Sequence, residues 1–175
     1  MSERDPLAAS LDALREAFDA SFAVPPPGAR ADEVALLAIR VGDEPVAVRV
    51  HDTVGLLKAG SIVSVPSRRP ELLGITGVRG AVVPVYSLAR LMGRTEVGAP
   101  GWIALAGSGD RIGLAFAEFE RHVRVSSRAI HAAAATHESG TTSAVVELDG
   151  ETRPLVAVAA IVRAIATRTS DQKTG

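Results

Sequence analysis

The amino-acid sequence predicts an all-β fold of the barrel or sandwich type. Short apolar runs of strand length recur at regular spacing through most of the chain, and glycine-rich turns separate them. The alternation of strands with long helices that a doubly wound α/β fold requires is missing. The 175 residues are 47% hydrophobic, which predicts a packed core, and only 3% aromatic, so aliphatic side chains must fill it.

Residues 1–23 are predicted to contain an amphipathic helix that begins near Pro6, with Asp5 as a favourable cap. Apolar side chains recur there every three or four residues and fall on one face: Leu7, Leu11, Leu14, Phe18 and Phe22. We favour packing of this face on the protein's own domain, with docking on a partner as the alternative. Three consecutive prolines then predict an extended linker over residues 24–32.

The main domain is predicted to span residues 33–166 and to consist of short strands joined mostly as hairpins. Strands are expected at 34–41, 45–50, 61–65, 75–78, 81–86, 102–106, 111–117, 120–125, 142–148 and 152–156. The Asp149-Gly150 dipeptide is the strongest short hairpin signal in the chain. Residues 126–141 are expected to form a long loop, 157–166 a short C-terminal helix and 167–175 a flexible tail.

Composition and charge argue against several classes of function. The 19 basic and 20 acidic residues give a net charge of -1, so no global field draws the chain to nucleic acid. The absence of cysteine removes disulfides, thiolate metal sites and cysteine nucleophiles. The four histidines lack the spacing of a metal site, and no serine lies in a nucleophile motif. We therefore expect no catalytic residue, no metal and no cofactor.

The segment at residues 74–93, GITGVRGAVVPVYSLARLMG, carries evenly spaced glycines that resemble a phosphate-binding loop only superficially. It has neither the G-x-G-x-x-G fingerprint nor the lysine of a Walker loop, and a strand-like run follows it. We expect instead a tight hairpin turn at Gly80, with Gly74 and Gly77 permitting a bulge or a close strand approach. Ser87 is expected to cap a short helix over 88–92 that Gly93 ends.

This segment resembles the signature of the CheW-like chemotaxis adaptor family, G-x-x-N-x-R-G-x-x-x-P-x-x-D-L. The matching positions are Gly74, Arg79, Gly80, Pro84 and Leu88. The resemblance covers residues 33–166. It implies two small five-stranded SH3-like barrels that share one hydrophobic interior, a count that agrees with the strands expected above.

The resemblance implies a cytoplasmic, non-enzymatic adaptor associated with a chemosensory array. A groove between the barrels would bind the helical signalling tip of a chemoreceptor, and another face would contact the regulatory domain of a CheA-type histidine kinase. Other CheW-like proteins are further expected partners, whereas nucleic acid and direct insertion into a membrane are not. The candidate partner-binding residues are Val54, Ile75, Val78, Arg79 and Gly80.

Three acidic positions of the family differ here, because they are occupied by Gly55, Ser87 and Ala157, and Gly77 replaces the usual asparagine. Without an acid at 55, Arg79 must pair with Asp52 or Glu71, or remain available to a partner's carboxylate. One alternative is therefore a divergent adaptor that binds receptor but has lost or altered its kinase contact, and so modulates the array. A second alternative is a small β-barrel enzyme or ligand-binding protein, which would need convergent polar groups in a pocket.

Overall fold

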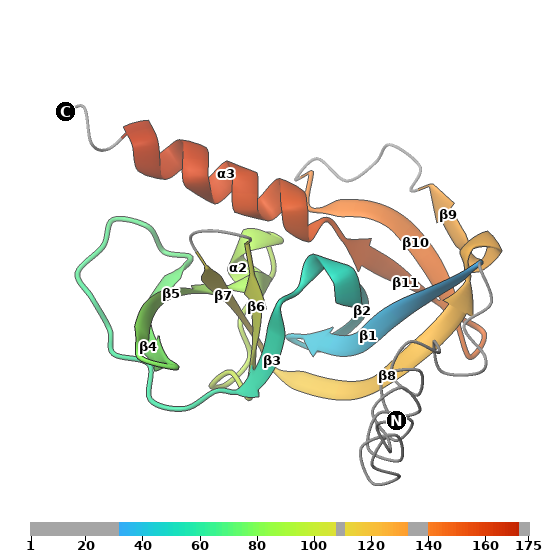
Figure 1. Cartoon of the computed structure of the whole chain (residues 1–175), viewed down its shortest axis with the longest axis horizontal. Helices are drawn as coiled ribbons and strands as arrows, with labels where there is room; N and C mark the ends of the chain where they lie inside the picture. Colours follow the sequence, from blue (N-terminus) through green and yellow to red (C-terminus); the bar gives the residue numbers. More distant parts are fainter. Residues whose placement is uncertain (1–31, 108–110, 133–139, 172–175) are drawn as a thin grey trace, which may run out of the picture. The chain divides into compact units, whose positions relative to one another are not determined.

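The computed structural model describes residues 32–107, 111–132 and 140–171, and within them the predicted all-β fold is confirmed (Figure 1). The strands form two sheets, one of six strands in the order β8-β1-β2-β11-β10-β9 and one of five in the order β3-β6-β7-β5-β4. We call these sheet A and sheet B. The helix expected in residues 1–23 and most of the linker expected at 24–32 lie outside the described residues.

Sheet A combines the beginning of the described chain with its end. Its strands are β1 (Glu33–Val41), β2 (Glu44–Arg49), β8 (Glu118–Ser126), β9 (Ile130–Ala132), β10 (Thr142–Leu148) and β11 (Glu151–Val156). Two hairpins, β1–β2 and β10–β11, are joined where β11 runs parallel to β2 at the pair Leu155 and Ala47. A 3-10 helix, η2 (Ser127–Ala129), connects β8 to β9.

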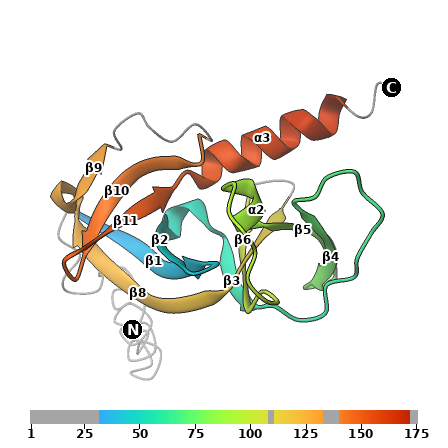
Figure 2. The same ribbon diagram turned by 180° about the vertical axis from the view of Figure 1, so that it is seen from behind.

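Sheet B is formed by the middle of the chain. Its strands are β3 (Gly55–Lys58), β4 (Leu72–Val78), β5 (Ala81–Ser87), β6 (Trp102–Ala106) and β7 (Ile112–Phe116). The 3-10 helix η1 (Val50–Asp52) leads the chain from sheet A into sheet B, and the short helix α2 (Leu88–Leu91) follows β5. The C-terminal helix α3 (Val158–Asp171) leaves β11 and packs against β6, as both views show (Figures 1 and 2).

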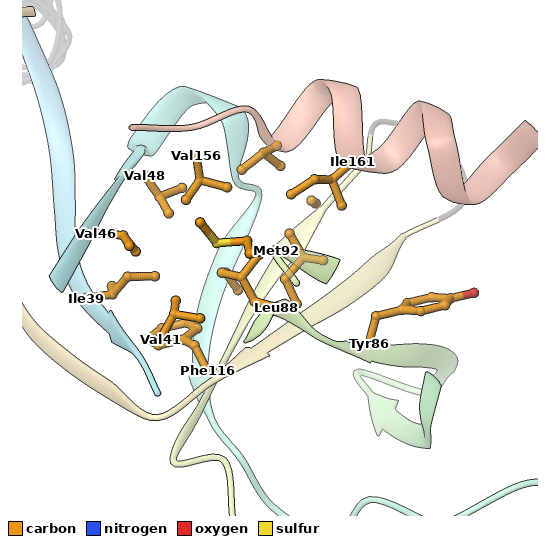
Figure 3. Close-up of a cluster of buried hydrophobic side chains, with 14 of the residues drawn as sticks. Ile39, Val41, Val46, Val48, Tyr86, Leu88, Met92, Phe116, Val156 and Ile161 are labelled. Carbon is orange, nitrogen blue, oxygen red and sulfur yellow. The ribbon is translucent and has the colours of Figure 1, made fainter. Parts of the chain in front are cut away.

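One apolar cluster lies between the two sheets and confirms the predicted shared interior (Figure 3). Ile39 and Val46 enter it from sheet A, Phe116 enters it from sheet B, and Leu88 of α2 lies among them. Each sheet also encloses a cluster of its own, one around Leu36 and Val146 and the other around Val83 and Ile103. The hydrophobic interior is therefore what joins the two halves of the domain.

Local turn and cap signals are confirmed where they were strongest. Arg79-Gly80 has φ values of 50° and 81°, and Asp149-Gly150 has φ values of 54° and 79°. Positive φ at both central residues is the mark of a two-residue hairpin turn whose twist matches that of the strands. Ser87 caps α2 as expected, because its Oγ accepts a hydrogen bond from the Arg90 backbone N–H at 3.2 Å.

Three element predictions were wrong. Residues 61–65 do not form a strand, since Val63 makes only an isolated bridge to Ile75. Strand propensity reflects how well side chains fit a sheet surface, but a strand also needs a neighbouring strand to pair with. The strands β3 and β9 were missed, because both are short: β3 pairs with the distant β6, and β9, which pairs with β10, lies within the loop expected at 126–141. Helix α3 continues to Asp171 instead of ending at 166, since no glycine or proline interrupts it.

A network of charged side chains crosses sheet A. Glu120 Oε2 lies 2.5 Å from Arg153 Nη1, and its Oε1 lies 3.4 Å from Arg40 Nη1. Glu151 Oε2 lies 3.0 Å from Arg153 Nη2. Arg153 is only 8% exposed, so its charge has to be compensated within the protein. The hydrogen bond from Arg153, aided by the charges of Arg153 and Arg40, lowers the pKa of Glu120 despite opposing burial.

The lowered pKa of Glu120 predicts a stability contribution that depends on pH. A carboxyl group whose pKa is lower in the folded than in the unfolded protein stabilises the folded state at pH values above the unfolded-state pKa. This stabilisation is lost as the pH falls through the folded-state pKa. The ordinary value is 4.5, so the contribution is expected to be complete near pH 7 and to decline below about pH 4.5. Urea unfolding of wild type and Glu120→Gln between pH 3 and 7 measures the difference. A difference that stays constant across this range would contradict the assignment.

Candidate functional site

The structure divides the five predicted partner-binding residues between two surfaces of sheet B. Val54 directly precedes β3, which forms one edge of this sheet. Ile75 and Val78 lie on β4 at the other edge, and Arg79-Gly80 forms the turn that ends this strand. This division could not be predicted from the sequence, because the order of the strands in a sheet depends on tertiary pairing.

The first surface is an open groove between η1 and α3, with a volume of about 330 Å³. It is lined by His51, Asp52, Val54, Gly107, Val158, Ala159, Val162 and Arg163. We call it the η1–α3 groove. Since η1 leads from sheet A into sheet B and α3 leaves sheet A to pack on β6, the groove lies where the two halves of the domain meet.

The groove has an apolar lining with charged groups at its sides. Val54 is 56% exposed, an unusual position for a valine, and Val158 and Val162 of α3 line the same hollow. On the η1 side, His51 Nε2 lies 3.2 Å from Asp52 Oδ1. On the α3 side is the exposed Arg163. Apolar walls with a few polar groups suit the binding of an amphipathic segment.

The start of α3 explains one of the substituted acidic positions. The carbonyl of Ala157 accepts hydrogen bonds from the backbone N–H groups of Ala160 and Ile161, which places Ala157 at the N-cap of the helix. An aspartate at this position would cap the helix with its carboxylate, and alanine cannot. Alanine at a position where the resemblance implies an acid therefore removes a possible cap of α3.

The second surface is the outward face of the hairpin formed by β4 and β5. Residues paired across antiparallel strands share a face, and the pair Thr76 and Val83 points inward, because Val83 is buried. The alternate pairs therefore point outward. With Val63, which bridges to Ile75, they leave an apolar surface of Val63, Ile75, Val82 and Pro84 that we call the β4–β5 patch. Val63 and Val82 are 59% and 71% exposed.

Val78, Arg79 and Gly80 differ in what they can contribute. Val78 is partly buried and packs against the apolar cluster of sheet B, so it supports the hairpin from within. Arg79 is exposed, and it forms no ion pair within the described part of the chain. Asp52, one of its two expected partners, is instead paired with His51. Gly80 supplies the positive φ of the turn.

Sequence reasoning missed most of the residues that form these surfaces. On the groove it missed His51 and the α3 residues, because α3 was interpreted only as a helix that closes the domain. On the patch it missed Val63, Val82 and Pro84. The alternation of β5 could have identified Val82, because this residue is adjacent to an inward-facing valine on a strand.

Other kinds of site have no support in the described ranges. Within residues 32–107, 111–132 and 140–171, His, Asp and Glu nowhere form a group of three or more that could hold a metal ion. None of the helices described is both long enough and apolar enough to span a bilayer.

Comparisons with known proteins agree with this fold. The family model described as the CheW-like domain matches residues 35–166. Protein FrzA of Myxococcus xanthus is 33% identical over 64 residues, which are 37% of this chain and 40% of FrzA. The crystal structure of the scaffolding protein TtCheW from Thermoanaerobacter tengcongensis superposes with a TM-score of 0.63 at 17% identity, covering 70% of this chain and 88% of that one. On the extent of the family match, this chain belongs to the CheW-like domain family.

Proposed function

We propose that the protein is an adaptor of a chemosensory array that binds the helical signalling tip of a chemoreceptor in the η1–α3 groove. At the β4–β5 patch it would bind the regulatory domain of a CheA-type histidine kinase. The two contacts together would hold receptor and kinase at a fixed separation in the cytoplasm. Other CheW-like proteins are further candidate partners within such an array.

Family membership supports the general part of this proposal. The chain is a CheW-like adaptor of chemotaxis signalling, a class of scaffolds without enzymatic activity. The solved neighbour is itself described as a scaffolding protein. The identity of each partner, and which surface it uses, is the part that we propose.

The observation that carries the proposal is the presence of two separate apolar surfaces on opposite edges of one sheet. A contiguous exposed apolar surface, unlike a single exposed aliphatic side chain, is typical of a site that a partner covers. A groove lined by a helix suits the packing of a second helix, whereas a flat hairpin face suits a folded domain. Two such surfaces on one small domain are what an adaptor requires.

A second candidate function is an adaptor that binds receptor but not kinase. It is favoured by Arg79, which is exposed at the end of β4 and has no acidic partner among the described residues. Gly55 lies on β3 opposite Leu105, and an added Cβ would be 3.5 Å from Leu105 Cδ1. A Cβ would therefore make an ordinary van der Waals contact there, and Gly55, where the resemblance implies a glutamate, lies at the edge of sheet B opposite to β4.

Three valine-to-aspartate variants test the proposal, because a charge at an apolar contact must be desolvated when the partner binds. Val54→Asp changes the groove, Val82→Asp changes the patch, and Val97→Asp is a control on a valine that is 50% exposed and lies outside both surfaces. Binding to the cytoplasmic signalling domain of the cognate receptor and to the isolated kinase regulatory domain would be measured by calorimetry. We expect Val54→Asp to weaken receptor binding about tenfold or more and Val82→Asp to do the same for the kinase.

The four measurements on the two surface variants separate the possibilities. Loss of each partner from only its own surface supports the two-surface adaptor. Receptor binding by wild type with no kinase binding supports the second candidate. Failure of wild type to bind either partner would overturn both functions.

A further inference from the structure

Arg163 occupies a position in the η1–α3 groove that the adaptor function does not itself explain. It lies on α3 one turn after Ala159 and next to Val162, and all three residues line the groove. Its side chain is exposed, and within the described ranges it forms no ion pair or side-chain hydrogen bond. A long cationic side chain beside an apolar hollow is therefore free to meet a group on whatever occupies the groove.

The charges around the groove favour an anionic group at this point. The carboxylate of Asp52, which lines the other wall, lies 3.2 Å from His51 Nε2, so this acid already has a neighbour of its own. Arg163 has no such acid among the described residues. The α3 wall of the groove thus carries an uncompensated cation. Guanidinium groups bind carboxylates through two parallel hydrogen bonds, which gives both affinity and orientation.

The shape of the groove selects a helix as the bearer of this anion. Val158, Ala159, Val162 and Arg163 follow the three- and four-residue spacing that forms one face of α3. The small side chain of Ala159 allows another backbone to approach closely, while Val54 and Val162 offer apolar contact from the two walls; Val158 is buried in the shared interior. A second helix laid along α3 would cover Val54 and reach Arg163 on the same face.

We propose that Arg163 is a specificity-determining residue of the groove and selects a partner helix that carries a carboxylate among its apolar contact residues. Rim charges of this kind discriminate between partners more than they add affinity, since a helix with a lysine at the same place is repelled. This inference rests on the proposed function, in which the occupant is the receptor's signalling tip. It adds which chemical feature of the tip is recognised and by which side chain.

The test compares three variants of the full chain with wild type in calorimetric binding to the cytoplasmic signalling domain of the cognate receptor. Arg163→Glu reverses the charge, Arg163→Gln removes it, and Arg128→Glu reverses an exposed arginine of η2, outside the groove, that also lacks an ion pair within the described chain. We expect the dissociation constant to rise about tenfold for Arg163→Glu and less for Arg163→Gln, with Arg128→Glu unchanged. Thermal melting checks that each variant is folded.

Three further measurements identify the partner group and the occupant. Raising the salt concentration should weaken wild-type binding more than that of Arg163→Gln, because only the former includes the ion pair. Lysine substitutions of the acidic residues in the receptor tip should include one that restores binding to Arg163→Glu. Size-exclusion chromatography of free wild type and Arg163→Glu tests whether the occupant is a second copy of the chain.

Each outcome has a defined meaning. If wild type binds receptor and both Arg163 variants bind equally well with the same salt dependence, the inference is wrong while the proposed function stands. If the wild-type protein does not bind the receptor, both the proposed function and this inference are wrong. If Arg163→Glu changes the oligomeric state, a second copy is the occupant and the inference is wrong.

Discussion

Replacing Gly74 with alanine is expected to lower the free energy of unfolding by about 3 kcal/mol, among the largest effects of any single substitution in this domain. Gly74 has φ of 151°, a conformation that residues with a Cβ rarely adopt. A Cβ added there would lie 2.1 Å from the carbonyl oxygen of Val63. This obstruction is backbone, so relief requires the Val63 segment to move away and to lose its two hydrogen bonds with Ile75.

The matched control is Gly77 on the same strand. A Cβ at Gly77 would meet no atom within 4 Å, so Gly77→Ala should change the free energy of unfolding by less than about 1 kcal/mol. Urea denaturation followed by the fluorescence of Trp102 on β6 reports both variants. Equal effects of the two substitutions would show that close backbone approach is not what requires glycine at 74.

The Gly74 variant has a consequence for function as well. The bridge between Val63 and Ile75 places Val63 on the β4–β5 patch, so displacement of this segment alters the patch and leaves the η1–α3 groove intact. Under the proposed function, a folded Gly74→Ala protein should therefore lose kinase binding before it loses receptor binding.

Truncating Leu88 to alanine is expected to destabilise the domain by about 2–5 kcal/mol. Leu88 is 1% exposed and belongs to the cluster that both sheets share (Figure 3). The cavity would therefore remove contacts from sheet A and sheet B together, even though α2 follows directly on a strand of sheet B. Leu91 on the same helix is only partly buried, and Leu91→Ala should cost clearly less.

Hydrogen exchange shows whether the two sheets unfold as one unit. If the shared interior couples them, Leu88→Ala should reduce amide protection equally at Val146 in sheet A and at Ile103 in sheet B. Loss of protection confined to sheet B would mean that the sheets are independent and that the shared cluster contributes little to their association.

The positions at which this chain departs from its family have different physical roles. Ser87 keeps the function of an acid, because its hydroxyl still caps α2. Ala157 gives up a cap at the start of α3, and its effect is on helix stability. Gly55 lies on β3, at the edge of sheet B opposite to β4 and the Arg79 turn, so an acid at position 55 would lie beside Val54 of the groove. Arg79 is exposed at the end of β4, next to the β4–β5 patch.

The sequence by itself determined the features that depend on neighbouring residues. Strand alternation, the two-residue turns at 79–80 and 149–150 and the Ser87 cap were all predicted, because backbone strain and local hydrogen bonds decide them. Residues 61–65 show the limit of this reasoning, since a strand-like sequence found only one bridge.

Only the tertiary structure decided which distant residues form a surface. The strand order of sheet B separates Val54 from Ile75, although both were predicted as partner-binding residues. The packing of α3 places Arg163 and Val54, which are far apart in the sequence, in one groove. The parallel strand pairs β2–β11 and β5–β7 determine which parts of the chain lie next to each other. These pairs form because the resulting sheets bury the shared interior. Burial depends on the whole chain at once, so a local sequence pattern cannot specify where two partners would bind.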